Sequence, residues 1–441
     1  MTPARFRWSM IGVAVLAGAI QLDLLHARRA SPGANVSPDG HFARVQAYWI
    51  IRGWWFVDPG HLDAARPGLS SSALHPPAPS LLLAAANAAG ATGLTPERVM
   101  EAAIFVGAVV VAALAVRTIV GGAVGDRAGV LAALVVATYP ALWVNPLTLG
   151  PETEVIAVCS LLLFGAARYW RGPSVGGAAE IGAYLGLAVL IRTDLVLLVL
   201  LLVVPLALLA RAVPGVVRAK YLAIMVAVAV VIVAPWAARN LATFTATTLV
   251  SNDAGSVIAG ANCVAAYGGA DAGWWNPACA SDAKASGDQS QRAAELRRVG
   301  QHDASAHSGD AIRTALIRLG RALNLYHPGQ SASLEQLVGR PVWVSRLAEW
   351  YFYALVPLAI AGAVALRRRH CLLFPFGSLV GLSVLTVIAA YGDARYRVEA
   401  DLALAMLAGI ALEVALRRGR AALRPNAGRH SRHTGVVPVT P

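Results

Sequence analysis

The segment LHPPAPSLLLAAANAAGAT, residues 74–92, determines the topology of this chain. It is apolar over most of its length, as a transmembrane helix would be, but Pro76 and Pro77 stand near its start. Proline suits the first turn of a helix beside a polar loop better than the middle of a span. If the segment crosses the membrane, every later loop changes sides. If it lies at the interface, or dips in and returns, the later loops keep their sides.

The composition indicates an integral membrane protein. Of the 441 residues, 57% are hydrophobic and only 14% are charged. A water-soluble domain carries about 25% charged residues, so this chain lacks the polar surface to cover itself in water. Its apolar residues form blocks, each about long enough to cross ~30 Å of hydrocarbon as a helix. The Leu, Ala and Val runs lack the period-two alternation of barrel strands, so we expect an all-α polytopic fold.

Ten apolar blocks are predicted to cross the membrane if residues 74–92 do not. They lie near residues 8–25, 99–119, 129–148, 153–170, 179–191, 195–210, 221–236, 347–366, 371–390 and 399–416. Nearly all basic loops then fall on one side, which the positive-inside rule makes cytoplasmic. We therefore predict about ten spans in the cytoplasmic membrane, a short interfacial or re-entrant helix, and both termini in the cytoplasm. The net charge of +13 comes largely from these loops and does not indicate nucleic acid.

The polar segments divide the chain into four regions. These are an N-terminal membrane region (1–236) with a first outer loop (26–98), a small extracytoplasmic module (237–346), C-terminal spans (347–416) and a basic tail (417–441). Four apolar residues of the module share one helical face: Ile312, Leu316, Leu319 and Leu323. This pattern predicts a helix lying on the membrane surface. Cys263 and Cys279 also lie in the module, and we expect them to form a disulfide if it faces an oxidising compartment.

Polar residues at the outer ends of the predicted helices indicate a site, because ionisable groups at membrane depth are energetically costly. The predicted topology gathers these residues on the outer face: Asp39, His75, Glu152, Glu154, Arg192, Asp194, Arg239, Asn240, Asp393, Arg395 and Arg397. Such a set suits a negatively charged, lipid-linked substrate with a carboxylate beside it. The sequence holds no HExxH or paired CxxC spacing, so no metal site and no cofactor is predicted, although a divalent metal is left open.

Several of these residues also have a purely structural interpretation. Asp39, between Pro38 and Gly40, could form an ordinary turn, and His75 could be a helix-start residue fixed by the two prolines. Glu152 could be a first-turn acid that opposes the helix dipole. Arg192 and Asp194 could form a local ion pair and nothing more.

The residues fall in motifs that resemble the C-type glycosyltransferase superfamily, in particular the family of protein O-mannosyltransferases and lipid A aminoarabinose transferases. In chain order the motifs are the acid of SPDGHF (37–42), HPPAPSLLLA (75–84), PETE (151–154), GLAVLIRTD (186–194), APWAARN (234–240), SNDAG (251–255), GANC (260–263) and YGDARYR (391–397). Each motif alone is weak. Their order and their common face make the resemblance.

The resemblance implies that a sugar passes from a polyprenyl-phosphate donor to an acceptor hydroxyl or amine on the outer face, with inversion. It implies that Asp39 acts as general base or orients the acceptor, with Glu152 as a second catalytic acid. Arg395 and Arg397 are the main candidates to stabilise the departing phosphate, and Arg239 and Arg192 are secondary candidates. The remaining expected substrate-binding residues are His75, Asp194, Asn240, Tyr391 and Asp393. The expected partners are the lipid-linked donor, membrane lipids and an acceptor that the sequence does not name.

Two departures and two rival functions stay open. Gly40 follows Asp39, where the family often has a second acid, and Phe42 stands where it often has tyrosine. These departures leave the acceptor type undetermined. One rival is a transporter or flippase of lipid-linked saccharides. Transporters usually show two related halves, whereas the two halves of this chain differ. The other rival is a non-catalytic membrane subunit.

Overall fold

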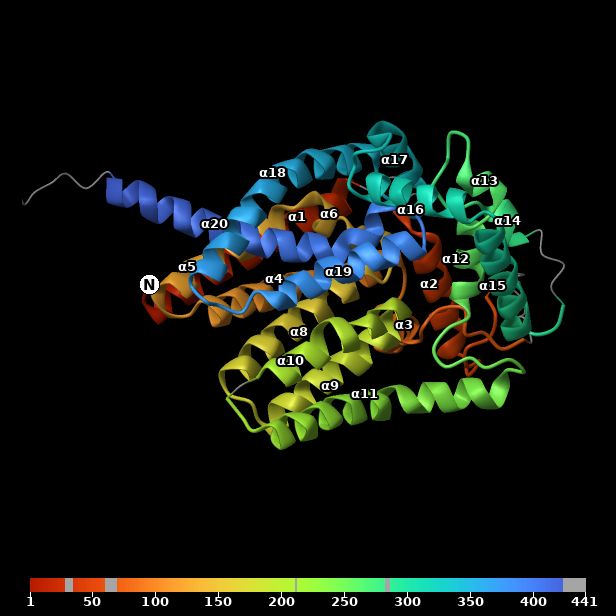
Figure 1. The fold of residues 1–441 in the computed structure, drawn as a ribbon, viewed down its shortest axis with the longest axis horizontal. Coiled ribbons are helices and arrows are strands. Elements are labelled where there is room, and N and C mark those ends of the chain that lie inside the picture. Colours follow the sequence, from red (N-terminus) through yellow and green to blue (C-terminus); the bar gives the residue numbers. More distant parts are fainter. Residues whose placement is uncertain (28–34, 60–69, 211, 282–285, 423–441) are drawn as a thin grey trace, which may run out of the picture.

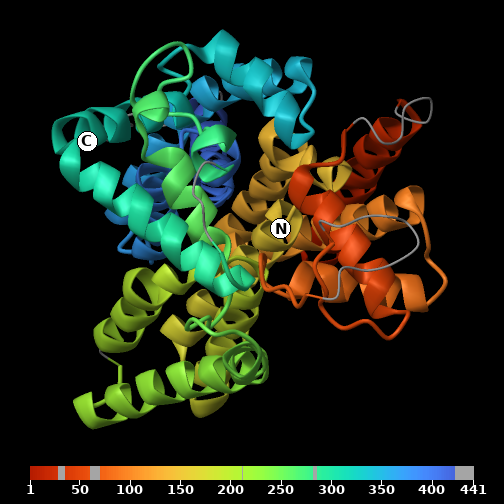
Figure 2. The same ribbon diagram turned by 90° about the vertical axis from the view of Figure 1, so that its right-hand side faces the viewer.

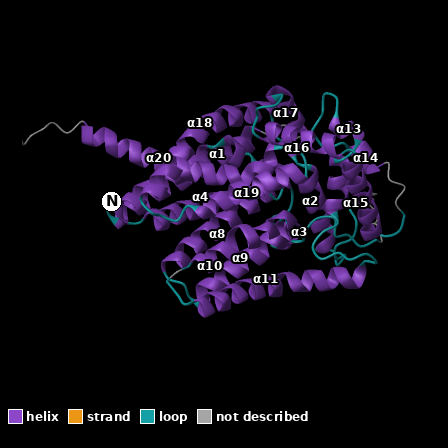
Figure 3. Cartoon of the chain, in the orientation of Figure 1, coloured by secondary structure: helices purple, strands orange, loops and turns teal. Residues whose placement is uncertain are grey.

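The protein is built from helices throughout the described part of the chain (Figure 1, Figure 3). The computed structural model describes residues 1–27, 35–59, 70–210, 212–281 and 286–422. Within these ranges there is no strand, only an isolated bridge between Val57 and Ser71. The predicted all-α class is therefore confirmed. The part of the predicted basic tail beyond residue 422, and residues 28–34 and 60–69 of the first outer loop, lie outside the described residues.

Most of the long helices run along the long axis of the molecule (Figure 1). From the N-terminus the elements are α1 (Pro3–Ala27), α2 (Pro38–Ile50), α3 (Ala78–Ala88), α4 (Leu94–Val120), α5 (Gly122–Thr138), α6 (Pro140–Trp143), α7 (Asn145–Thr148), α8 (Glu152–Arg171), α9 (Val175–Ile191), η2 (Thr193–Leu197), η3 (Val199–Val203), α10 (Val204–Leu209) and α11 (Gly215–Thr243). The C-terminal elements are α18 (Val342–Arg368), α19 (Phe374–Ala389), η5 (Ala394–Arg397) and α20 (Val398–Ala422).

Shorter helices between α11 and α18 gather at one end of the molecule (Figure 1). We call them the module: α12 (Asp253–Ala261), α13 (Val264–Tyr267), α14 (Pro277–Ser281), α15 (Gln289–Ala306), α16 (Ser308–Ala322), α17 (Pro328–Leu334) and η4 (Glu335–Val338). Viewed from that end, the N-terminal helices lie on one side of the molecule and α11 on another (Figure 2). A disulfide joins Cys263 to Cys279 within the module.

Five helices of the described chain are long and apolar enough to cross a membrane: α1, α4, α8, α11 and α18. A sixth span results if α5 and the following α6–α7 pair count as one, although the two parts are bent by 63°. The bend falls at Tyr139, because the proline after it disfavours helical backbone there. Each predicted block coincides with a helix or a run of short helices, but α9, α19 and the segment Thr193–Leu209 are short. The count of ten spans stays a prediction.

The segment 74–92 forms a helix too short to span. Helix α3 has 11 residues, which corresponds to about 16 Å at ~1.5 Å per residue. The hydrocarbon core measures ~30 Å, so a straight α3 crosses about half of it. Pro77 is its N-cap, as the two prolines suggested. This agrees with a segment that lies at the interface or dips in.

Small residues let the central helices pack closely. Helix α20 lies against α18 and α5. A Cβ atom on Gly409 would overlap the backbone of Ala132 in α5, and one on Gly362 in α18 would overlap the carbonyl of Leu407. Close approach of this kind is how helices associate where both lipid and protein are apolar. It packs the middle of α20, the helix that follows the YGDARYR motif, against α5 and α18.

Helix α16 buries two of its three arginines, Arg318 and Arg321, and exposes two residues of its apolar face. Arg318 and Arg321 are almost fully buried; the guanidinium of Arg318 donates to the carbonyl of Ile388 in α19, and that of Arg321 donates to the carbonyls of Ala270 and Ala272 in the module. Ile312 and Leu316, on the opposite side, are each 68% exposed. Exposed apolar side chains of this kind are unfavourable in water, so we expect an apolar surface to cover the outer face of α16. The predicted position on a membrane surface stays a prediction, now with the exposed face identified.

Candidate active site

Asp39 is positioned by a close contact between α2 and the turn before α8. Ser37 caps α2, because its hydroxyl accepts from the N–H of Gly40 at 2.9 Å, and its own N–H donates to the carbonyl of Thr148 at 2.9 Å. A Cβ atom on Gly40 would lie 2.6 Å from that same carbonyl oxygen. Only glycine fits, and this explains why Gly40 stands beside the acid. The contact brings Asp39 next to Glu152, which begins α8.

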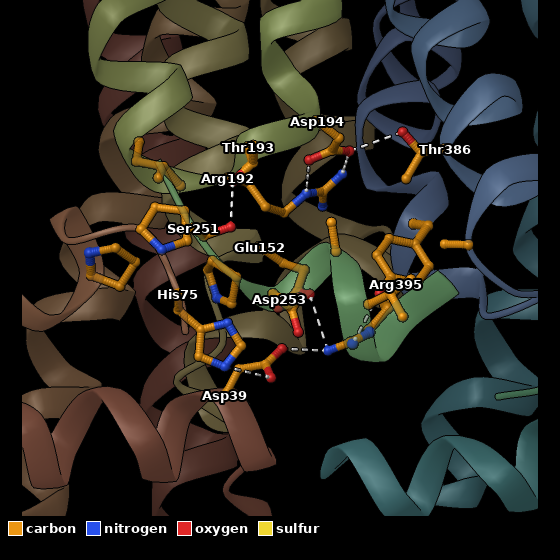
Figure 4. Close-up of a pocket in the computed structure, with 18 of the residues that line it drawn as sticks. Asp39, His75, Glu152, Arg192, Thr193, Asp194, Ser251, Asp253, Thr386 and Arg395 are labelled. Atoms are coloured by element: carbon orange, nitrogen blue, oxygen red, sulfur yellow. Dashed lines mark hydrogen bonds and ion pairs between the residues drawn. The ribbon is translucent and has the colours of Figure 1, made fainter. Parts of the chain in front are cut away.

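Arg395 reaches Asp39 from the far end of the chain. Its Nη1 donates to Asp39 Oδ2 at 2.6 Å (Figure 4). Its Nη2 donates to the Tyr391 hydroxyl at 2.7 Å. Asp393 caps the short helix that carries it, accepting from the Arg395 N–H at 2.9 Å. The loop is held against the module, since the N–H of Gly392 donates to the carbonyl of Gly273 at 2.8 Å. The guanidinium is therefore fixed from several sides.

His75 and Glu152 complete the centre. His75 Nε2 lies 3.7 Å from Asp39 Oδ1, and Glu152 Oε1 lies 3.9 Å from Arg395 Nη1. The imidazole packs edge-on against the ring of Phe42, with centroids 4.8 Å apart. The structure thus brings together Asp39, His75, Glu152 and Arg395 from four distant segments (Figure 4).

Two cavities meet at this centre. The first, of about 410 Å³, has apolar walls from the ends of membrane-region helices, including Ile191, Val196 and Leu385. The second, of about 620 Å³, is lined mainly by the module, including Trp274 and Trp275. Residues common to both cavities are Asp39, His75, Asp253, Val257, Arg395 and Tyr396. The ion pair therefore stands at the boundary between an apolar-walled cavity and a cavity of the module.

Arg192 is the centre of a second cluster of charged side chains, in the wall of the first cavity. Its guanidinium donates to both oxygens of Asp194, at 2.8 and 2.6 Å, and to Glu399 at 2.6 Å. Thr386 donates to Asp194 at 2.9 Å, and Ser383 donates to Glu399 at 3.0 Å. The predicted Arg192–Asp194 pair thus extends to α19 and α20. One positive charge faces two carboxylates here.

The two aspartates at the boundary differ in their electrostatics. Burial raises the pKa of Asp39, but the positive charge of Arg395, together with the effect of His75, outweighs burial and holds that pKa below its ordinary value. Burial also raises the pKa of Asp253; His75 opposes the rise and the charge of Asp39 adds to it. The net direction for Asp253 is upward. The pKa values of these two neighbouring carboxyl groups are therefore shifted in opposite directions.

Five predicted site residues line neither cavity: Glu154, Arg239, Asn240, Asp393 and Arg397. Arg239 donates to the carbonyls of Phe56 and Ser72, at 3.2 and 3.1 Å, and Asn240 is fully buried. Arg397 donates to Asp401 at 2.9 Å and lies over the ring of Phe352. These side chains hold the loops and helices around the site. Asp393 and Tyr391 lie beside Arg395, and Tyr391 lines the second cavity.

Sequence reasoning missed Asp253, Tyr396 and Glu399 as site residues. Asp253 begins α12 and lies within the SNDAG motif, so the signal was present but unassigned. Tyr396 separates the two arginines of YGDARYR and contacts Arg395 at 3.2 Å. Glu399 follows the same motif but belongs to an apolar block, which concealed it.

No metal centre emerges from the described residues. Within them, no group of three or more His, Cys, Asp and Glu side chains could hold a metal ion. Between Asp39 and Glu152, the guanidinium of Arg395 supplies the positive charge.

Comparisons with solved structures identify the fold. The archaeal oligosaccharyltransferase AglB from Archaeoglobus fulgidus, in complex with an inhibitory peptide and a dolichol-phosphate, aligns with a TM-score of 0.53 and 16% identity, over 96% of this chain and 52% of that one. The apo form of the Archaeoglobus fulgidus oligosaccharyltransferase gives a TM-score of 0.53 and 15% identity, over 94% and 51%. The chain shares the fold of this oligosaccharyltransferase. It spans about half the length of the oligosaccharyltransferase that it matches.

ArnT from Cupriavidus metallidurans, bound to undecaprenyl phosphate, aligns with a lower TM-score of 0.44 and 17% identity, over 96% of this chain and 80% of that one. No family model and no curated protein matches the chain. The predicted resemblance is confirmed for the fold. At identities of 15–17%, similarity of this kind extends to the fold alone.

Proposed function

We propose that the protein is a membrane glycosyltransferase. It transfers a sugar from a polyprenyl-phosphate-linked donor to an acceptor hydroxyl or amine on the extracytoplasmic face. The observation that carries the proposal is the Asp39–Arg395 ion pair at the boundary of two cavities. A transfer reaction needs two substrates to meet at one reactive centre, and this arrangement supplies it.

The first cavity suits the lipid-linked donor. Its walls combine apolar side chains such as Val196 and Leu385 with the charged side chains of Arg192 and Arg395. A polyprenyl phosphate has the same two parts, an apolar chain and an anionic head. Arginine presents a rigid fork of donors that matches phosphate oxygens. The oligosaccharyltransferase of the same fold is described in complex with a dolichol-phosphate, which supports a donor of this class.

The second cavity suits the acceptor. It lies between the ion pair and the module, and its wall mixes the aromatic rings of Trp274 and Trp275 with polar side chains such as Asp271 and Asn276. An acceptor bound there reaches the anomeric carbon from the side away from the donor phosphate. Attack from that side inverts the configuration. The acceptor oxygen forms the new bond to the sugar as the bond to the phosphate oxygen breaks.

Arg395 stabilises the phosphate that leaves. Negative charge grows on the phosphate oxygens in the transition state, and a preorganised guanidinium in a water-poor cavity lowers the energy of that charge. Asp39 holds the guanidinium in place, and a carboxylate at the boundary accepts the acceptor proton. The products are the glycosylated acceptor and polyprenyl phosphate, and the proton passes on to water.

Purified protein with a panel of polyprenyl-phosphate sugars tests the proposal. We expect loss of one donor and formation of polyprenyl phosphate, abolished by Asp39→Asn. The Asp310→Asn variant removes an exposed carboxylate of the module, outside both cavities, and should leave turnover unchanged. Donors carrying mannose, glucose, arabinose and galactosamine should be included. A folded protein that consumes none of them, but moves them across a vesicle membrane, would be a flippase.

A further inference from the structure

Asp39 is poorly suited to accept a proton. Its Oδ2 accepts from Arg395 Nη1 at 2.6 Å, and its Oδ1 lies 3.7 Å from His75 Nε2. Both carboxylate oxygens therefore face groups that carry or can carry positive charge. Such an environment stabilises the ionised form and weakens the carboxylate as a base. The reaction proposed above needs a base, because a neutral hydroxyl loses its proton as the new bond forms.

Asp253 is the carboxylate at the same boundary that no cation neutralises. It lines both cavities, and it forms no ion pair with any described residue. Its Oδ1 accepts a hydrogen bond from Ser256 at 3.2 Å. His75, Asp39, Arg395 and Tyr396 are the titratable and charged groups whose fields reach it. Asp253 is partly buried. Because it lines both cavities, it can contact both substrates, and because it has no ion-pair partner among the described residues, it keeps its affinity for a proton.

The start of α12 is held rigidly, which fixes Asp253 relative to the other groups. The N–H of Asn252 donates to the carbonyl of Ala73 at 2.7 Å, two residues before His75. Thr248 donates to the Asn252 side chain at 2.7 Å. A Cβ atom on Gly255 would overlap the backbone of α15, so α12 and α15 pack without a gap. General-base catalysis requires this kind of fixed geometry.

We propose that Asp253 is the general base of the transfer reaction and that Asp39 is a positioning residue for Arg395. The acceptor O–H or N–H gives its proton to an Asp253 oxygen while its heavy atom bonds to the anomeric carbon. The electron pair of the breaking bond goes to the phosphate oxygen, which stays on the polyprenyl phosphate. Asp253 then releases the proton to water. This assignment rests on the proposed function.

Three variants and a small nucleophile test the assignment in the full-length protein. Asp253→Asn should lower kcat/KM by ~10²–10⁴-fold, while the KM for donor stays within about threefold. Azide needs no deprotonation, so it should restore sugar transfer to Asp253→Asn as a glycosyl azide. Azide should not rescue Arg395→Ala, because this variant lacks the guanidinium that stabilises the leaving phosphate. Asp253→Glu keeps a carboxylate and should retain partial activity, which distinguishes a chemical role from a structural one.

The pH dependence gives a second readout. In the wild type, kcat/KM should fall as the pH decreases and the base is protonated. This acidic limb should lie above the ordinary aspartate pKa of ~3.9, and it should vanish in Asp253→Asn. If the wild type is active and Asp253→Asn keeps more than about a third of its activity, the assignment is wrong and the base is another group. If the wild type consumes no donor, the proposed function fails first and the assignment fails with it.

Discussion

Arg395 donates a hydrogen bond of 2.6 Å to Asp39, although the two residues are 356 positions apart in the chain. Asp39 stands in the first turn of α2, and Arg395 stands in the short helix η5 before α20. Everything proposed for this protein depends on that contact, because it places an anion-binding guanidinium where two cavities meet.

Replacing Arg395 with lysine should abolish transfer while leaving the protein folded. Lysine keeps the charge but cannot reach Asp39 and Tyr391 at once, as the two Nη atoms do. We expect kcat/KM for donor to fall by at least ~10²-fold, in line with the loss of a transition-state donor. Asp39→Asn combined with Arg395→Lys should cost little more than either change alone, since both break one unit. Additive losses would show that the two residues act separately.

Alanine at position 40 should displace α2. The new methyl group would meet the carbonyl of Thr148, so the helix must shift and the fold should lose about 1–3 kcal/mol. Transfer activity should fall with it, because Asp39 moves away from Arg395. Gly107→Ala in α4 is the matched control, since nothing lies within 4 Å of a Cβ atom there. It should unfold at the wild-type temperature or slightly above. Equal melting temperatures for both variants would contradict the packing argument.

Acid should weaken the fold partly through Asp39. Its pKa is lower in the folded protein than in the unfolded chain, so its ionised form stabilises the fold above the ordinary pKa of ~3.9. That stabilisation is lost as the pH falls through the lowered folded pKa. We expect the melting temperature of the wild type to drop more steeply below about pH 4 than that of Asp39→Asn. Parallel curves would mean that the ion pair adds nothing to stability.

The outer face of α16 should contact lipid. Ile312 and Leu316 are exposed while Arg318 is buried, so the helix is amphipathic in the sense that suits a bilayer surface. Photoactivatable phospholipids should cross-link to residues on this face. Leu316→Asp should reduce the cross-linking, and Arg313→Ser, a control on an adjacent exposed position, should not. Cross-links confined to the long helices, with none on α16, would place the module away from the membrane.

The C-terminus should lie in the cytoplasm. Arg367 and Arg368 end α18 and Arg369 is its C-cap, and this end of the helix lies away from the module, as the positive-inside rule predicts if the module is outside. A reporter fused after residue 441 should therefore give a cytoplasmic signal. A signal from the outside would invert the topology and put both cavities on the wrong face.

The sequence sufficed for the helical class and for the central pair of the site. Apolar blocks locate the helices because burial in lipid requires them, and Pro76 and Pro77 correctly marked the start of a short helix. Asp39 and Arg395 were predicted on one face, and they lie in contact. What a single sequence lacked was the direction of each side chain. Arg397 is two residues from Arg395, yet its guanidinium faces Asp401 and a phenylalanine ring.

Side chains near a predicted site often hold the scaffold instead. Arg239 belongs to a motif of the resembling family, but its donors are satisfied by carbonyls of loops. Only three-dimensional packing distinguishes such a residue from one that meets substrate. Asp253 is the opposite case, a residue that lines both cavities but was not predicted as a site residue. Its SNDAG motif was recognised, but its position depends on the packing of α12 on α15.

A structure with bound polyprenyl phosphate tests the central claim most directly. We predict that the phosphate lies in the first cavity, within hydrogen-bonding distance of Arg395, with the lipid chain along Val196 and Leu385. A phosphate bound instead in the separate pocket lined by Arg117 and Arg171, in the last turns of α4 and α8, would contradict the account.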